Sequence, residues 1–143
     1  MAANTNSIRL AMATAVALMV PLGVSFAAST LDFETYKAKV EPIFLEKRTG
    51  HARCVVCHSA NNSAFRLQPL AAGSSKWTEE QTRMNFENVS HLVKPGEPGA
   101  SKLLIHPLSP DAGGDEFHGG GRQFASKDDP AWKTIADWVS QAK

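Results

Sequence analysis

The only two cysteines of this 143-residue chain lie three positions apart, in the run CVVCH at residues 54–58. A disulfide between them would close almost no loop, so it would add little stability. A tetrahedral zinc site needs four ligands, and this pair supplies only two thiols. A lone C-x-x-C can also act as a thiol–disulfide switch, but the strand–helix pattern of thioredoxin-like proteins is absent around it.

The same run matches the C-x-x-C-H pattern of covalent haem attachment. Cys54 and Cys57 are spaced so that their thiols can add to the two vinyl groups of one haem. His58 follows directly and can give a ring nitrogen to the iron from one face. The sequence therefore predicts one covalently bound haem c, held by these three residues.

The first 27 residues have the features of an export signal. Arg9 supplies a positive start, residues 10–20 (LAMATAVALMV) form an apolar run, and small residues lead to an expected cleavage point after Ala27. We expect a periplasmic or otherwise extracytoplasmic domain at residues 28–143, with no stable membrane insertion once the signal is cut. An uncleaved anchor is the alternative, because residues 10–28 could just span a bilayer.

Basic and acidic side chains are almost balanced, with 15 Lys and Arg against 14 Asp and Glu. The chain has no basic stripe and no block of like charges, so nucleic-acid binding has no electrostatic support. We expect redox partner proteins instead, and any steering of such a partner must come from local charged patches.

Apolar spacing predicts an all-α domain with long irregular loops. Residues 31–45 have helical spacing, and Pro42 is expected to kink or restart that helix. The stretch 58–75 has no such periodicity. A second helix is expected to begin at Thr78, because TEEQ is a capping-box pattern, and to reach about Leu92.

The last third of the chain alternates short helices with loops. Ser101 is expected to cap a helical turn that Pro107 ends, and the loop at 109–126 contains five glycines. Loops this long are uncommon in small domains, and they more often have a function than not. The pair Asp129-Pro130 predicts the start of a final helix. Its expected apolar face consists of Trp132, Ile135, Trp138 and Val139.

This order of elements resembles class I cytochromes c, in which an aromatic N-terminal helix precedes C-x-x-C-H and an amphipathic helix closes the chain. The resemblance implies a small fold whose first and last helices cross and shield one haem, and a role as an electron carrier rather than an enzyme. By analogy, the helix contact would be made by Phe33, Tyr36 and Val40 against Trp132, Ile135 and Trp138.

The second axial ligand departs from the usual class I pattern, in which a late methionine serves. Only Met84 remains after the signal, inside a predicted helix where a methionine is commonly a core filler. The late loop instead carries His118 in the run FHGGG. With SKLL at 101–104 and GGD at 113–115, this loop resembles a bacterial group of cytochrome c-like domains with an H-x-G-G distal loop. That resemblance implies His118 as the distal ligand, with His106 and Met84 as second choices.

Other titratable residues near the motif have simpler interpretations. His51 is too close to the motif in sequence to reach the opposite haem face easily, and His91 lies near a helix end, where a cation is favoured. Arg53 and Arg66 could pair with haem propionates or could simply be solvated.

Two other functions stay open at this point. If His58 and His118 both bind the iron, no position is left for a small molecule, which favours electron transfer. A haem enzyme or gas sensor would instead keep the distal position open and could use His118 or His106 as an acid–base group. A haem subunit of a periplasmic dehydrogenase would have the same sequence features.

Overall fold

The computed structural model describes residues 1, 30–60 and 63–142. All regular structure in this part of the chain is helical, apart from an isolated bridge between Leu108 and Phe124. The fold class is therefore all-α, as the sequence predicts. The predicted signal at residues 1–27 lies outside the described residues except for Met1. None of the described helices combines the length and the apolarity that crossing a membrane requires.

The N-terminal helical segment is continuous but changes its winding. It consists of α1 (Phe33–Thr35), the π-helix η1 (Tyr36–Val40) and α2 (Glu41–Leu45). In η1 the amide of Glu41 donates to the carbonyl of Tyr36, five residues earlier. Pro42 follows directly, and a proline inside an α-helix lacks an amide hydrogen and clashes with the carbonyl four residues before it. Where the sequence predicts a kink or a restart, the helix instead contains a π-bulge, which accommodates the proline while the helix continues.

Helix α4 (Glu79–Ser90) begins as the sequence predicts. The hydroxyl of Thr78 accepts from the amide of Gln81 at 3.2 Å, and the Gln81 side-chain oxygen accepts from the amide of Thr78 at 3.1 Å. This reciprocal pair satisfies two amides that the first helical turn leaves free. The helix ends at Ser90, two residues before the predicted Leu92.

One face of α4 is polar and holds the irregular segment that follows the cysteine motif. The side-chain amides of Gln81, Asn85 and Asn88 bond to the backbone of residues 66–69 at 2.7–3.2 Å. Asn85 is fully buried by this contact. The irregular segment is thus fixed by side chains of a neighbouring helix rather than by a sheet.

The last third contains α5 (Lys102–Ile105), α6 (Pro130–Ser140) and the single 3₁₀ turns η2 (Pro98–Ala100) and η3 (Pro110–Ala112). Asp129 caps α6 as predicted, since its carboxylate accepts from the amides of Ala131 and Trp132. Ser101 differs from its expected role. Its hydroxyl accepts from the amide of Lys94 and donates to the carbonyl of Glu97, both at 2.9 Å, so it ties a loop rather than capping α5.

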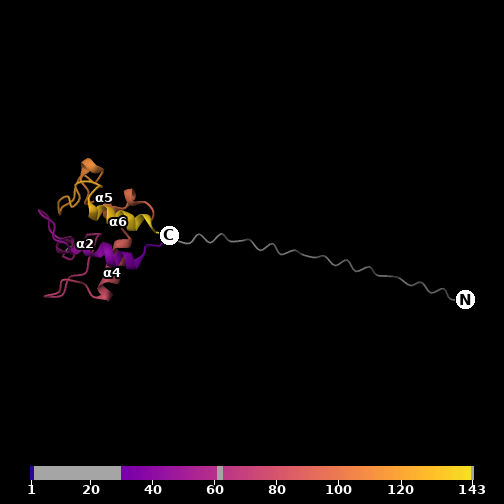
Figure 1. Ribbon diagram of the computed structural model, residues 1–143. Helices are drawn as coiled ribbons and strands as arrows, with labels where there is room; N and C mark the ends of the chain where they lie inside the picture. Colours follow the sequence, from indigo (N-terminus) through magenta and orange to yellow (C-terminus); the bar gives the residue numbers. More distant parts are fainter. Residues whose placement is uncertain (2–29, 61–62, 143) are drawn as a thin grey trace.

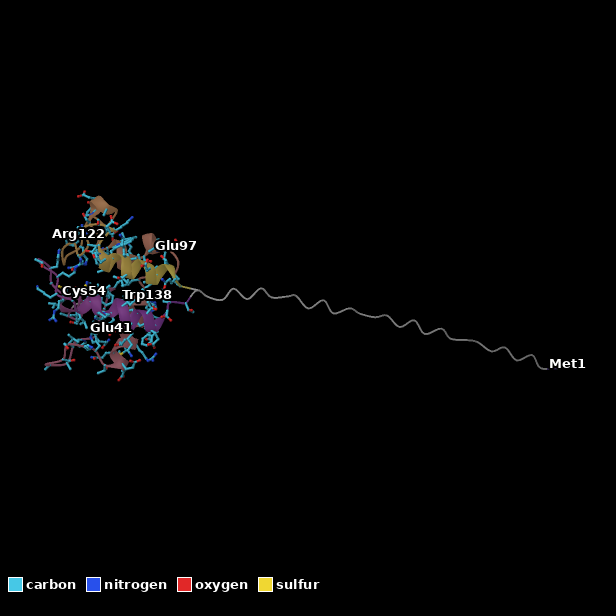
Figure 2. All side chains as sticks on the ribbon, in the orientation of Figure 1. Met1, Glu41, Cys54, Glu97, Arg122 and Trp138 are labelled. Carbon is cyan, nitrogen blue, oxygen red and sulfur yellow. The ribbon has the colours of Figure 1, made fainter. Side chains whose placement is uncertain are left out.

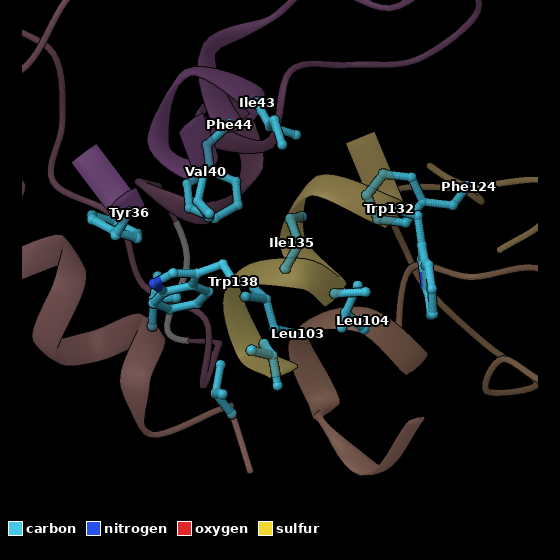
Figure 3. Close-up of a cluster of buried hydrophobic side chains, with 14 of the residues drawn as sticks. Tyr36, Val40, Ile43, Phe44, Leu103, Leu104, Phe124, Trp132, Ile135 and Trp138 are labelled. Carbon is cyan, nitrogen blue, oxygen red and sulfur yellow. The ribbon is translucent and has the colours of Figure 1, made fainter. Parts of the chain in front are cut away.

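The first and last helical segments pack against each other, as the resemblance implies. Figure 1 shows α6 alongside the N-terminal helices, with α5 beyond α6 and α4 on the other side of the N-terminal helices. The rings of Tyr36 and Trp138 have centroids 5.6 Å apart, and the indole nitrogen of Trp138 donates to the carbonyl of Asp32 at 2.8 Å. Figure 3 shows Tyr36, Val40, Ile135 and Trp138 in one cluster of buried side chains.

Candidate functional site

The cysteine motif forms one helical turn, α3 (Cys54–His58). Residues three and four apart in a helix share a face, so the two thiols and the imidazole of His58 face the same side. All three line a single cavity of about 420 Å³. Figure 2 shows Cys54 near one end of the N-terminal helices and Trp138 toward the other end.

The walls of this cavity are mostly apolar and come from segments far apart in the sequence. They include Ile43, Phe44, Phe65, Leu103, Phe124 and Ile135. The polar lining contains three imidazoles, His58, His106 and His118, and the charged residues Arg53, Lys102 and Asp115. A largely apolar cavity with a few convergent polar groups is typical of a cofactor site, and its volume lies within the usual range of about 300–1,000 Å³.

The orientation of the His58 ring is fixed by hydrogen bonds at one nitrogen. Nδ1 lies 2.8 Å from the carbonyl oxygen of Phe65 and 3.0 Å from the hydroxyl of Ser63. Because a carbonyl can only accept, Nδ1 carries the proton, which leaves Nε2 as the nitrogen that can bind a metal. Burial, and to a lesser degree the nearby imidazoles, lowers the pKa of His58, although the Phe65 bond opposes the shift. The ring is thus held in the neutral form that metals require.

His118 lines the same cavity and is anchored in the same way. Its Nδ1 hydrogen-bonds the carbonyl of Gly121, so Nε2 is again the nitrogen left for a metal. The ring centroids of His58 and His118 lie 6.2 Å apart, and their planes are 22° from parallel. The residue that the resemblance implies as distal ligand therefore lies near the motif histidine, although 60 positions separate the two in sequence.

The distance between these rings fits one iron between two imidazoles. A metal–imidazole bond is about 2 Å long and a ring nitrogen lies about 1.1 Å from its ring centroid, so two opposed ligands have centroids about 6 Å apart. The observed 6.2 Å agrees with that value. Together with the two thiols on the same wall, the residues present fit an iron porphyrin.

The two alternative distal ligands differ in their placement. His106 lines the cavity, and its ring stands perpendicular to that of His118 with centroids 4.9 Å apart. Its Nδ1 lies 2.9 Å from Oδ2 of Asp115, and this hydrogen bond is the largest cause of the lowered pKa of Asp115. Met84 lies on α4 with 44% of its surface exposed and does not line the cavity.

The environment of the two thiols also bears on the alternative in which the motif is a thiol–disulfide switch. Burial raises the pKa of Cys54 to about 11, and both cysteines are free thiols. Catalytic C-x-x-C pairs instead depend on a thiolate with a lowered pKa. The environment of Cys54 therefore disfavours a thiol–disulfide switch.

The remaining candidates are spread around the domain. Arg53 lines the cavity, whereas Arg66 does not. His51 lies near Gly121, beside the loop that carries His118, and His91 is exposed at the C-terminal cap of α4. The partnership of His106 with Asp115 gave no signal in the sequence, because their contact depends on how the intervening loop folds back.

No protein-family model matches this chain, and no curated protein or solved structure matches it. Within the described residues, no group of three or more His, Cys, Asp and Glu side chains is arranged to hold a metal ion. A porphyrin brings its own equatorial ligands, so a protein needs to supply only the axial ones.

Proposed function

We propose that this chain is an electron-transfer protein that carries one covalently attached haem c outside the cytoplasm. In this proposal Cys54 and Cys57 hold the porphyrin, and His58 and His118 are the axial ligands. The observation that supports it most strongly is the pairing of the two imidazoles. Each is anchored at Nδ1 by a backbone carbonyl, and their centroid separation of 6.2 Å is compatible with two ligands on one iron.

Covalent attachment needs no oxidant. The thiols of Cys54 and Cys57 would each add across one vinyl group of the porphyrin, with the sulfur bonding to one vinyl carbon and the thiol hydrogen passing to the other. Cys54 and Cys57 share a helix face, which lets both sulfurs reach one porphyrin edge while His58 approaches the iron from the same turn. Because burial keeps the Cys54 thiol protonated, we expect attachment to depend on a maturation system.

When bound, the haem supplies an iron that alternates between the ferric and ferrous states. His58 and His118 would hold both axial positions, so small molecules would find no open site. Two neutral imidazoles that remained bound in both oxidation states would keep the reorganisation small. Replacing the usual methionine by histidine also lowers the expected potential. These properties favour electron transfer over gas binding or peroxide chemistry.

The arrangement of the helices supports a class I-like cytochrome c fold as part of this proposal. The contact of Tyr36 with Trp138 joins the first and last helical segments, and Phe44 and Ile135 from those segments line the cavity. The export signal predicted at residues 1–27 supports a periplasmic location, where redox proteins would be the partners.

Carbon monoxide binding tests this function against an open haem site. The reduced mature protein is mixed with carbon monoxide at neutral pH, and the visible spectrum is followed. We expect slow or negligible binding, because His118 must leave first. Rapid stoichiometric binding would overturn the electron-carrier proposal and favour a haem enzyme or gas sensor.

A further inference from the structure

We infer that His106 is a positioning residue that fixes the orientation of the His118 ring, and with it the angle between the two axial imidazole planes. This inference rests on the proposed function. It concerns a residue that the proposed function does not use, because His106 lines the cavity without being one of the two facing imidazoles.

Hydrogen bonds hold both the backbone and the ring of His106. Its amide donates to the carbonyl of Lys102 at 3.1 Å, at the end of α5. Its ring is fixed by the bond to Asp115, whose Oδ2 also lies 3.4 Å from Nζ of Lys102. The amide of Asp115 in turn donates to the carbonyl of Ile105 at 3.2 Å. Both members of the pair are therefore anchored to the same short helix.

The loop that carries His118 contains no α-helix among the described residues. Three glycines follow His118, and the loop closes locally through the bond from the amide of Gly121 to the carbonyl of His118 at 3.0 Å. The hydrogen bond at Nδ1 restrains the ring but leaves it some rotation about the axis through Nε2. The perpendicular ring of His106, with its centroid 4.9 Å away, blocks that rotation.

The angle between axial imidazole planes has a direct spectroscopic consequence. In a low-spin ferric haem, nearly parallel planes separate the iron d orbitals and give a rhombic electron paramagnetic resonance spectrum. Planes that are nearly perpendicular leave two of these orbitals close in energy and give a spectrum dominated by one large g value. The observed 22° between the rings of His58 and His118 therefore predicts the rhombic form.

The test compares low-temperature spin resonance spectra of the oxidised holoprotein and three variants. We expect the wild type to be rhombic and His106→Ala to move toward the large-g form or to give a broad distribution. His106→Phe keeps a flat ring at the position and should restore much of the wild-type spectrum. His91→Ala, on the exposed cap of α4, should leave the spectrum unchanged.

The outcomes that would overturn the role of His106 can be told apart from those that would overturn the proposed function. A red, low-spin His106→Ala protein with the wild-type spectrum overturns the positioning role while leaving the proposed function intact. A high-spin His106→Ala protein also overturns it, because His106 would then be a ligand itself. If His106→Ala does not accumulate, Asp115→Ala tests the same point by removing the hydrogen-bond partner of the His106 ring, and an unchanged spectrum there overturns the inference. A wild type without haem contradicts the proposed function instead.

Discussion

Gly120 lies against the ring of His118: a Cβ atom built on Gly120 would come within 3.2 Å of Cε1 of that ring. This separation is tighter than ordinary van der Waals contact. Gly120 also lines the cavity, so the absence of its side chain leaves room for the distal imidazole.

Replacing Gly120 by alanine should therefore disturb the axial bond of His118. We expect Gly120→Ala to bind carbon monoxide faster than the wild type in the reduced state, because the ring is pushed from its position. Gly99→Ala is the matched control, since no atom of the described residues lies within 4 Å of its added Cβ. Equal binding rates for both variants and the wild type would show that Gly120 does not support the ligand.

Removing the distal imidazole should leave one coordination position of the haem iron free. We expect His118→Ala to give a high-spin ferric spectrum and stoichiometric carbon monoxide binding after reduction. His91→Ala should remain low-spin. An unchanged low-spin spectrum in His118→Ala would remove His118 from the distal position and point to His106, the other imidazole beside it.

Features set by contacts within a few residues could be predicted from the sequence. The start of α4 at Thr78 and that of α6 at Asp129 follow from side chains that bond amides two or three residues later. The arrangement of the cysteine motif also depends only on neighbouring residues, because α3 brings Cys54 and His58 to one face within a single turn.

Features set by distant contacts could not be predicted in this way. The apolar residues of α4 gave no sign that Asn85 is fully buried, because its partner is the backbone of a loop 17 positions earlier. The approach of His106 to His118 depends on the loop between them. That loop is closed by a hydrogen bond from the amide of Ser109 to the carbonyl of Phe124 at 2.9 Å. Neither contact leaves a periodic pattern in the sequence from which it could be predicted.

Glu41 makes stability depend on pH. Its side chain is 8% exposed, Oε1 accepts from the hydroxyl of Thr82 at 3.0 Å, and Oε2 finds no hydrogen-bond partner among the described residues. Burial is the largest cause that raises the pKa of Glu41, whereas the Thr82 bond and Lys37 oppose the shift. The folded protein therefore binds this proton more tightly than the unfolded chain. That contribution is complete below the ordinary pKa of 4.5 and is lost as the pH rises through the folded value.

We therefore expect Glu41→Gln to gain stability relative to the wild type as the pH rises from 4 to 8. Urea unfolding of the mature protein at several pH values measures this difference. Glu87→Gln, on the exposed part of α4, should show no such trend. A difference between Glu41→Gln and the wild type that stays constant with pH would contradict the role of the buried carboxyl.

The capping box of α4 should contribute measurably to stability. Thr78→Ala removes the hydroxyl that accepts from the amide of Gln81, and we expect a loss of about 1 kcal/mol in the free energy of unfolding. Thr78→Ser keeps a hydroxyl and should lose much less. Urea titration of both variants measures the effect, and equal losses would show that the hydroxyl is not what stabilises the helix.

The most direct test of the central claim is the mass and pigment of the mature protein, made with its leader and a c-type maturation system. Intact mass spectrometry and a pyridine haemochrome assay are applied to the wild type and to the variant with Cys54→Ser and Cys57→Ser. We predict that the wild type is red, carries the added mass of one haem and gives the spectrum of two thioether links, and that the variant has no covalent haem. A colourless wild type with the mass of the polypeptide alone would contradict the proposed function.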